Sequence, residues 1–521
     1  MSSTVELPAP PEPVLERGGV RHRYAWAALI SGMGGVVGRL LQGLTPVALA
    51  RILGRTEYGV YALLMSVLAV VAGTAHLGQN MALQKFLPEY AAKDRERGKA
   101  ILMSSVWLVG TSILLIGLTL LIAAPWVARS LYHDGTLAGK LRFVVLLVVA
   151  TAIFNLLSSI SLGLQEVRTY TLAVIVRSGT FLVAGSVGGF FLGIYGALAG
   201  QFIAVLAGAV MLAIACCRIA HLQFPVTASG IFRRDIVAEL MGFGVPALLA
   251  GFVVAGGLWW ANTALVRSTG YEQLADFGVA LAVMQLIVLL PSSLSTPAVS
   301  FMSEVYTVQG KQDFSRFVSD NLRIIWAITL PICFACALFA DKLISIGFGS
   351  RYITAVPLAR WMAIAALLIS ISSQIGLAIS SLGKMWQALL LNLLWLIVFA
   401  PLAAFGARLG ARGVVYAYCF SYFIFALLVW GYSEKLLGIR YQRLVPMLLL
   451  SVFAAALAGV LGPQQLYGLG WARLFLVVGL LFLEWTWALR NEERNRICEM
   501  ACLLYRRFLS ARFLSRAVQE P

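Results

Sequence analysis

The stretch AILMSSVWLVGTSILLIGLTLLIAAPWVA, residues 100–128, contains no charged side chain and decides the class of fold. A helix of about 20 such residues crosses the hydrocarbon core of a bilayer. Similar stretches recur along the 521 residues, of which 60% are hydrophobic and 12% charged, whereas soluble domains carry about 25% charged residues. We therefore expect an all-α polytopic membrane protein.

The apolar stretches define about fourteen transmembrane helices. The expected helices begin near Tyr24, Tyr58, Ala100, Leu141, Leu172, Ile194, Ile236, Ala275, Leu322, Thr354, Trp386, Gly413, Leu444 and Gly470. With the N-terminus inside, roughly twice as many Lys and Arg residues flank the cytoplasmic ends of these helices as the outer ends. An even number of crossings then returns the C-terminus to the same side, so we expect both termini to be cytoplasmic.

Composition and spacing also exclude several function classes. The net charge of +17 is spread over short clusters between apolar spans, which is typical of cytoplasmic loops rather than of a nucleic-acid-binding surface. The four histidines lack metal-ligand spacing, and no segment between spans is long enough for a catalytic domain. We predict no enzyme, metal, cofactor or nucleic-acid partner.

Short matches along the chain indicate an internal duplication. Glu57–Tyr61 (EYGVY) is similar to Asp276–Ala280 (DFGVA), and Leu162-Gly163 matches Leu382-Gly383. All of the matches have offsets near 215–220 residues. Since six spans per copy is an even number, the copies point the same way, as two six-helix lobes related by pseudo-twofold symmetry along the membrane normal, with a substrate site between them.

The duplication predicts six segments. They are a disordered cytoplasmic tail (1–23), an N-terminal six-helix lobe (24–218), a cytoplasmic linker (219–235), a C-terminal six-helix lobe (236–435), an extra transmembrane helix pair (436–490) and a basic amphipathic tail (491–521). The last segment alternates Arg with apolar residues, which favours a helix on the anionic membrane surface. Recruitment of a partner by this tail is the alternative.

Leu49–Gly54 (LARILG) and the following Glu57–Tyr61 resemble the opening of the polysaccharide (O-antigen type) flippases. These proteins belong to the multidrug/oligosaccharidyl-lipid/polysaccharide (MOP) exporter superfamily. Leu343–Gly349 (LISIGFG) and Leu382-Gly383-Lys384 fit the same family farther along. In the related lipid II flippase an Arg-Asp pair is typical of the first helix, and it falls on Thr45-Pro46 here, which argues for another glycan as cargo.

The resemblance implies a transporter that works by alternating access in a bacterial inner membrane, for surface polysaccharide biosynthesis. Its implied cargo is an oligosaccharide on a polyprenyl pyrophosphate carrier. Membrane lipids would surround it, and a polysaccharide polymerase and assembly proteins could be partners. The glycan and the use of a proton or sodium gradient stay open.

Two arginines inside spans are the main candidates for binding the pyrophosphate. Arg39 lies in the first span and Arg177 in the fifth, where a charge costs about 2.5–3.5 kcal/mol unless it faces a cavity or a partner. The guanidinium fork matches phosphate oxygens. The alternative is a bond to a backbone carbonyl or a headgroup. Arg267 and Arg360 are further candidates that could instead anchor helix ends.

Other polar residues are candidates for the glycan and for ion coupling. Trp260 and Asn262 combine an aromatic face with an amide, and Asn155 lies in the fourth span. An aromatic belt at the interface and helix–helix hydrogen bonds are the alternatives. His76 and Glu304 are weaker candidates for ion coupling, with helix packing and loop solvation as alternatives.

Two rival functions remain from the sequence. A multidrug exporter of the same superfamily would need acidic residues for cationic drugs, and the candidate residues are basic. A non-transporting scaffold of a polysaccharide assembly complex would use the basic tail.

Overall fold

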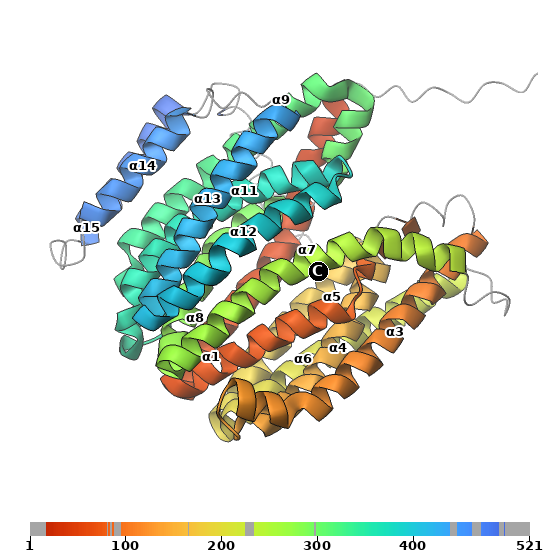
Figure 1. The fold of residues 1–521 in the computed structure, drawn as a ribbon. Helices are drawn as coiled ribbons and strands as arrows, with labels where there is room; N and C mark the ends of the chain where they lie inside the picture. The colour runs from red at the N-terminus through yellow and green to blue at the C-terminus, as the bar shows by residue number, and fades with distance from the viewer. Residues whose placement is uncertain are drawn as a thin grey trace, which may run out of the picture.

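The computed structural model describes residues 17–80, 82–83, 86–87, 95–164, 166–223, 234–295, 298–437, 445–460, 470–488 and 494. Within these residues the chain is helical and contains no strand, which confirms the all-α polytopic fold (Figure 1). The first half holds α1 (Arg17–Ala75), α3 (Arg95–Trp126), η1 (Val127–Leu131), α4 (Leu137–Gly163), α5 (Val167–Thr180), η2 (Phe181–Gly185) and α6 (Ser186–Gln223).

The second half is longer. It holds α7 (Arg234–Thr269), α8 (Tyr271–Leu294), α9 (Ala298–Leu338), α10 (Ala340–Gly347), η3 (Ser350–Ala355), α11 (Val356–Ser381), α12 (Met385–Gly406), η4 (Ala407–Leu409), α13 (Ala411–Leu437), α14 (Val445–Val460), α15 (Gly470–Leu483) and η6 (Glu484–Ala488). The expected N-terminal tail, linker and basic C-terminal tail lie mainly outside the described residues.

Ten helical runs of the described chain are long and apolar enough to cross a membrane. Two of them, Val37–Ala75 and Arg168–Arg218, have 39 and 51 residues and are interrupted by non-helical Gly54 (φ 80°) and Gly193 (φ 57°). The chain reverses at Gly193, because a Cβ on Gly196 would lie 1.9 Å from the Gly188 oxygen. A straight α1 of 59 residues would be about 88 Å long, so it too must contain two crossings. The ten runs therefore provide twelve crossings.

The backbone repeats itself at the offset that the sequence predicts. Glycines of positive φ turn the chain at Gly54 and Gly270, which are 216 residues apart, and at Gly193 and Gly410, which are 217 apart. The close contact beside Gly193 recurs beside Gly410, where a Cβ on Gly413 would lie 2.1 Å from the Gly406 oxygen. Glycine is needed at both reversals because backbone meets backbone there. The two halves are thus built on one pattern.

The two halves meet along α1, α7 and α8. A Cβ on Gly43 of α1 would lie 2.6 Å from Leu286 Cδ2 of α8. Past the reversal, a Cβ on Gly59 would lie 2.0 Å from the oxygen of Tyr271, and the backbone at Gly78 lies against Gly244 of α7. The first crossing of α1 therefore packs on α8. The second crossing packs on the beginning of α8, and the turn that follows it at Gly78 packs on α7.

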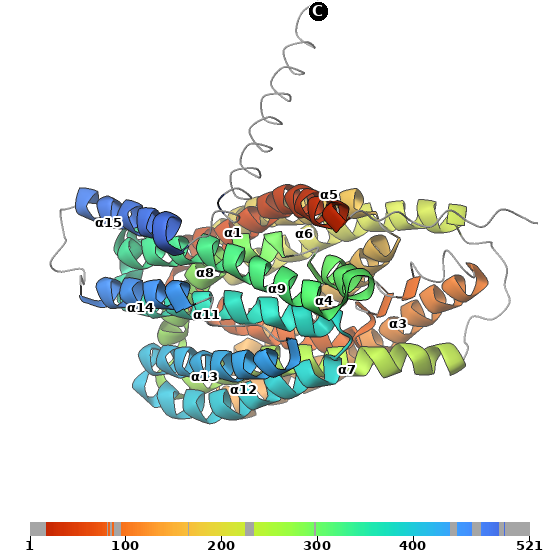
Figure 2. The ribbon, with the colours of Figure 1, turned by 90° about the horizontal axis from the view of Figure 1, so that it is seen from above.

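The helices α14 and α15 lie beside α9, outside the repeated halves (Figure 2). The Trp326 indole donates a hydrogen bond to Ser451 Oγ at 2.9 Å, which attaches α14 to α9. Arg473 Nη1 of α15 lies 2.7 Å from Asp341 Oδ1 of α10, and the two side chains are only 5% and 4% exposed. This buried ion pair fixes the extra helix pair to the second half.

We expect Asp341→Ala to lower the thermal unfolding midpoint of the purified protein markedly. Removing one partner of a buried ion pair leaves an unpaired charge and costs about 3–5 kcal/mol. Asp313→Ala is the matched control, because its 3.6 Å pair with Arg316 joins side chains that are 30% and 60% exposed and should contribute less than about 1 kcal/mol. Equal midpoints for the two variants would contradict a structural role for the Asp341–Arg473 pair.

Candidate functional site

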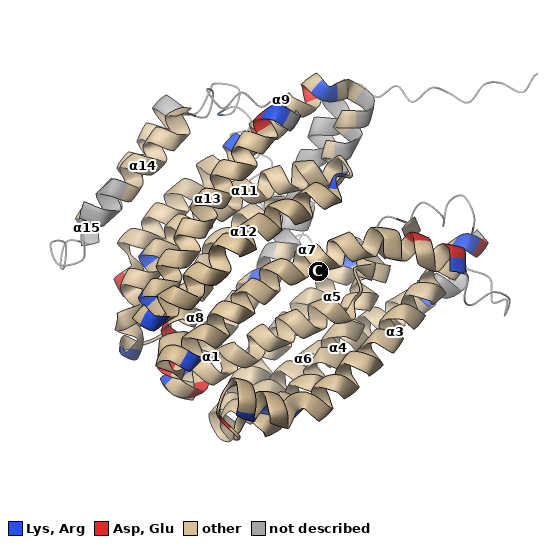
Figure 3. Ribbon diagram, viewed as in Figure 1, with Lys and Arg blue, Asp and Glu red and all other residues tan. Residues whose placement is uncertain are grey.

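The charged side chains gather at the ends of the helices, and the spans between are nearly free of them (Figure 3). Against this background, a cavity of about 390 Å³ opens inside the first half, between α1, α4, α5 and α6. Polar side chains on its wall include Gln42, Asn155, Arg177 and Gln201. Among the described residues that line this first cavity, Arg177 alone carries a charge. The wall of the cavity is therefore positive.

Arg177 and Arg39 approach the same region of α5. The Arg177 guanidinium stacks on the Phe154 ring at 4.7 Å, and Arg39 Nη1 donates to the hydroxyls of Ser292 and, at 3.3 Å, Ser293. Both guanidinium groups lie within electrostatic range of Tyr170. The arginines stand 15 and 16 residues before their turn glycines, Gly54 and Gly193, which places both about 23 Å from the turns.

Tyr170 was not among the candidates that the sequence singled out. It lies seven residues before Arg177, and in an α-helix that spacing places both side chains on one face. The position could have been found by asking which polar residues share the face of Arg177.

A second cavity of about 390 Å³ lies between α7, α11, α12 and α13. Its wall includes Ser372, Asn392 and Phe425 of the second half and Asn80 of the first. The described residues that line it carry no charge. The two cavities are therefore alike in size and different in electrostatic character.

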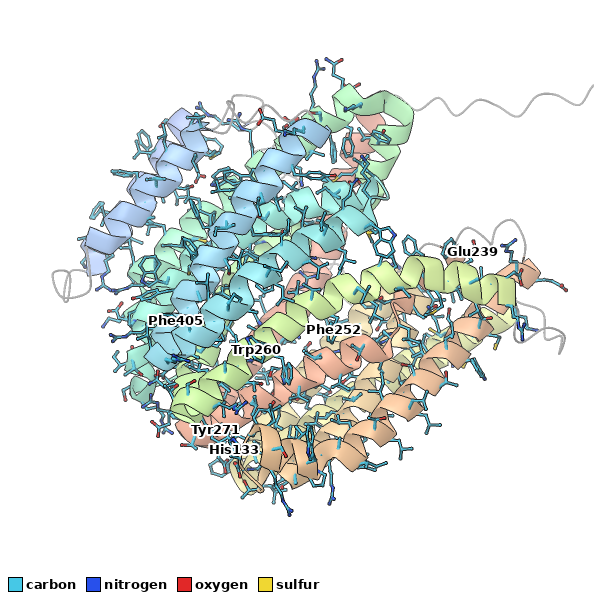
Figure 4. All side chains as sticks on the ribbon, in the orientation of Figure 1. His133, Glu239, Phe252, Trp260, Tyr271 and Phe405 are labelled. Carbon is cyan, nitrogen blue, oxygen red and sulfur yellow. The ribbon has the colours of Figure 1, made fainter. Side chains whose placement is uncertain are left out.

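The remaining candidates for substrate binding are dispersed. Asn155 lines the first cavity, but Asn262 is 4% exposed, lies outside both cavities, and has no hydrogen-bond partner for Oδ1 in the described chain. Trp260 is 45% exposed on the outer side of α7, where its indole donates to Ala400 O at 3.1 Å (Figure 4). Arg267 is exposed in the last turn of α7, and Arg360 donates to Ala337 O at 3.2 Å.

Of the two candidates for ion coupling, only the side chain of His76 lies in the described part of the structure. His76 is buried, and neither of its ring nitrogens has a hydrogen-bond partner among the described residues. Glu304 belongs to α9, and its side chain lies outside the described part of the structure. Within that part, no three His, Cys, Asp or Glu side chains are grouped as metal ligands would be. Ion coupling stays a prediction.

The halves are joined at the end that carries the turn glycines, which we call the closed end. Asp276 Oδ2 of α8 accepts hydrogen bonds from Arg55 Nη2 of α1 and from Thr354 Oγ1, both at 2.8 Å. The Asp276 side chain is 2% exposed. Nearby, the Tyr352 hydroxyl donates to Ala50 O at 3.0 Å. A partly buried ion pair and a buried hydrogen bond thus join α1 to the second half.

A second group of bonds joins the loop before α4 to the second half at the same end. The Tyr271 hydroxyl donates to Asp134 Oδ2 at 3.1 Å, and the Trp259 indole donates to the Tyr132 hydroxyl at 3.1 Å. Burial raises the pKa of Asp134, but hydrogen bonds from Thr136 and Tyr271 outweigh it, so this pKa lies below its usual value. The carboxylate therefore stays ionised at neutral pH, and its contribution to closure is lost as the pH falls through that pKa.

Figure 4 places Tyr271 and His133 together at the closed end and Glu239 at the opposite end. At that opposite end, Glu239 of α7 pairs with Arg97 of α3 at 2.8 Å.

We expect Arg55→Ala to make the closed end permeable to water-soluble reagents. The substitution leaves the buried Asp276 carboxylate without its charge partner, at a cost of the order of 3 kcal/mol to the closed arrangement. A cysteine introduced in place of Gln42 should then react faster with an impermeant maleimide added at the closed end. Glu272→Gln is the control, because Glu272 is 60% exposed and lies 3.5 Å from Arg55. Unchanged labelling of the Arg55→Ala protein would show that the ion pair does not hold this end.

This fold defines a polytopic all-α membrane protein built from two repeated helical halves. The chain belongs to the polysaccharide biosynthesis protein family, whose model matches residues 48–357. The resemblance to a polysaccharide family that the sequence motifs indicate is thus confirmed.

Two relatives support the assignment. The chain is 22% identical over 439 residues to the uncharacterized membrane protein MJ1068 of Methanocaldococcus jannaschii, a match that covers 79% of this chain and 84% of that one. It is 25% identical over 358 residues to the stage V sporulation protein B of Bacillus subtilis, covering 63% and 68%.

Solved structures agree on the fold. An inward-facing multidrug resistance MATE family transporter of the MOP superfamily superposes with a TM-score of 0.64 at 16% identity, covering 77% of this chain and 94% of that chain. A MOP superfamily transporter from Pyrococcus furiosus gives 0.63 at 17% identity, covering 80% and 96%. At this identity the likeness concerns the fold alone.

Proposed function

We propose that this chain is a flippase that moves a polyprenyl-pyrophosphate oligosaccharide across the bacterial inner membrane for surface polysaccharide biosynthesis. The observation that carries the proposal is the charge of the cavity walls. Arg177 lines the first cavity, Arg39 lies near the same tyrosine, and no carboxylate occurs among the described residues that line either cavity. Arginine donates paired hydrogen bonds to phosphate oxygens and stays charged in an apolar setting.

The position of the arginines fits loading from the cytoplasmic leaflet. With both termini in the cytoplasm, the closed end faces outward, and Arg39 and Arg177 stand about 23 Å inward from it by helical rise. In a hydrocarbon core about 30 Å thick, this depth lies toward the cytoplasmic surface, where sugars are attached to the carrier lipid. Alternating access would then require the Arg55–Asp276 contact to break when the outer side opens.

The rival transport function is export of cationic drugs. The similarity to multidrug transporters concerns the fold, and a site for cations would need a carboxylate. Two buried acids of the second half, Asp276 and Asp341, are already paired with Arg55 and Arg473. The scaffold function would depend on the basic tail, residues 491–521, which could also contact a polysaccharide polymerase.

Selectivity in reconstituted vesicles tests the proposal. We expect wild-type protein to expose a fluorescent polyprenyl-pyrophosphate oligosaccharide to an impermeant quencher at least tenfold faster than protein-free vesicles do. A lipophilic cationic dye should cross at the protein-free rate. Transport of the dye without transport of the glycan lipid would favour the multidrug exporter, and transport of neither would favour the scaffold.

A further inference from the structure

We propose that the second cavity is the binding site for the glycan and takes neutral, hydroxyl-rich sugar residues. This inference rests on the proposed function, which assigns the pyrophosphate to the arginines of the first half. It divides the cargo between two sites of different chemistry, one cationic and one uncharged.

The wall of the second cavity has the groups that a neutral sugar needs. Ser372 lines the cavity. Its hydroxyl oxygen is buried and has no hydrogen-bond partner in the described chain. The side chain is 3% exposed, so its hydroxyl is a buried polar group without a partner among the described residues. A sugar hydroxyl can both donate to and accept from it, which removes the penalty of an unpaired buried group.

Amide and aromatic groups complete the wall. Asn392 of α12 and Asn80, which follows α1, each offer donors and an acceptor, and Phe425 of α13 offers a ring. Since Asn80 belongs to the first half, the cavity lies where the halves meet. No charged residue occurs among its described lining residues, so an anionic pyrophosphate has no counter-charge there, whereas an uncharged sugar needs none.

The space is large enough and is kept open by small residues. A volume of about 390 Å³ lies within the range of small-molecule sites, about 300–1,000 Å³. Gly251 of α7 and Gly376 of α11 line the cavity, and a Cβ added at either would meet no heavy atom within 4 Å. A larger side chain at Gly376 can therefore enter the cavity without disturbing the helices.

Binding of two lipids to the full-length protein in lipid nanodiscs tests the inference. One probe is polyprenyl pyrophosphate without sugar, and the other carries a neutral tetrasaccharide on the same pyrophosphate. We expect Gly376→Leu to weaken binding of the tetrasaccharide lipid at least tenfold and to leave the sugarless lipid unchanged. Gly431→Leu is the matched control, because Gly431 is an exposed helical glycine with nothing within 4 Å and lies outside the cavity.

Alkylation of Ser372→Cys gives a second measurement that does not depend on adding bulk. The tetrasaccharide lipid should slow modification of the introduced thiol at least fivefold, and the sugarless lipid should not. Equal effects of Gly376→Leu on both probes, or no protection of the thiol, would overturn the glycan site while leaving the proposed function in place. Failure of wild-type protein to bind either lipid would overturn the proposed function and this inference with it.

Discussion

Replacement of Arg177 by alanine is expected to reduce translocation of the glycan lipid at least 100-fold, while the protein still inserts and purifies normally. Two charge-assisted hydrogen bonds to phosphate, at about 1.5–3 kcal/mol each, are lost with the guanidinium. A loss of about 2.7 kcal/mol already corresponds to a factor of 100 in rate. Arg177→Lys should retain part of the activity, because lysine keeps the charge without the planar fork.

Arg39→Ala should likewise abolish transport without preventing insertion, and it also removes the contacts to Ser292 and Ser293. Arg316→Ala serves as the control for loss of a positive charge, since Arg316 is 60% exposed and distant in sequence from both cavity walls. The measurement is the initial rate at which the glycan lipid in vesicles becomes accessible to the quencher. Full transport by a well-expressed Arg39→Ala or Arg177→Ala protein would remove that arginine from the binding site.

Gly196→Ala is expected to prevent the α6 reversal from forming and to yield little or no monodisperse protein. Its added Cβ would lie 1.9 Å from the Gly188 oxygen, and that backbone atom cannot rotate away as a side chain can. Gly110→Ala should have the opposite effect, because nothing lies within 4 Å of its Cβ position and alanine favours a helix by about 0.5–1 kcal/mol. Yield and thermal midpoint after size-exclusion chromatography distinguish the two, and a wild-type profile for Gly196→Ala would contradict the close contact.

The helices and the repeat could be predicted from the sequence because both leave strong patterns. Uninterrupted apolar runs define the spans, and short matches such as that of Glu57–Tyr61 with Asp276–Ala280 identify the offset between the halves. The residue-by-residue alignment of the two halves was less accurate. The sequence paired Leu162 with Leu382, whereas the structurally equivalent residues, the C-caps of α4 and α11, are Leu164 and Leu382. Two-residue motifs are too short to fix an alignment to the residue.

The faces of the helices were harder to predict. A membrane helix is apolar on the lipid side and on the packed side, so its hydrophobic pattern does not indicate which side chains point inward. Trp260 and Asn262 are neighbours in sequence, and the structure places one on the outer surface and the other in the interior. Arg177 stood out because a charge within a span needs a cavity or a partner, whereas Tyr170 beside it gave no such signal.

The contacts that join the two halves at the closed end could not be predicted from the sequence. In the sequence, Asp276 appears only as part of a repeated motif. The Arg55–Asp276 bond joins residues 221 positions apart, and only the packing of α1 on α8 brings them together. Long-range ion pairs of this kind depend on tertiary structure.

The most direct test compares translocation of a fluorescent polyprenyl-pyrophosphate oligosaccharide by wild-type protein and by the Arg39→Ala/Arg177→Ala double variant, at matched amounts in the same vesicles. An anionic cargo held by these arginines predicts rapid transport by the wild type and a rate equal to that of protein-free vesicles for the double variant. Equal rates for the two proteins, or no transport by the wild type across several glycans and ion gradients, would contradict it.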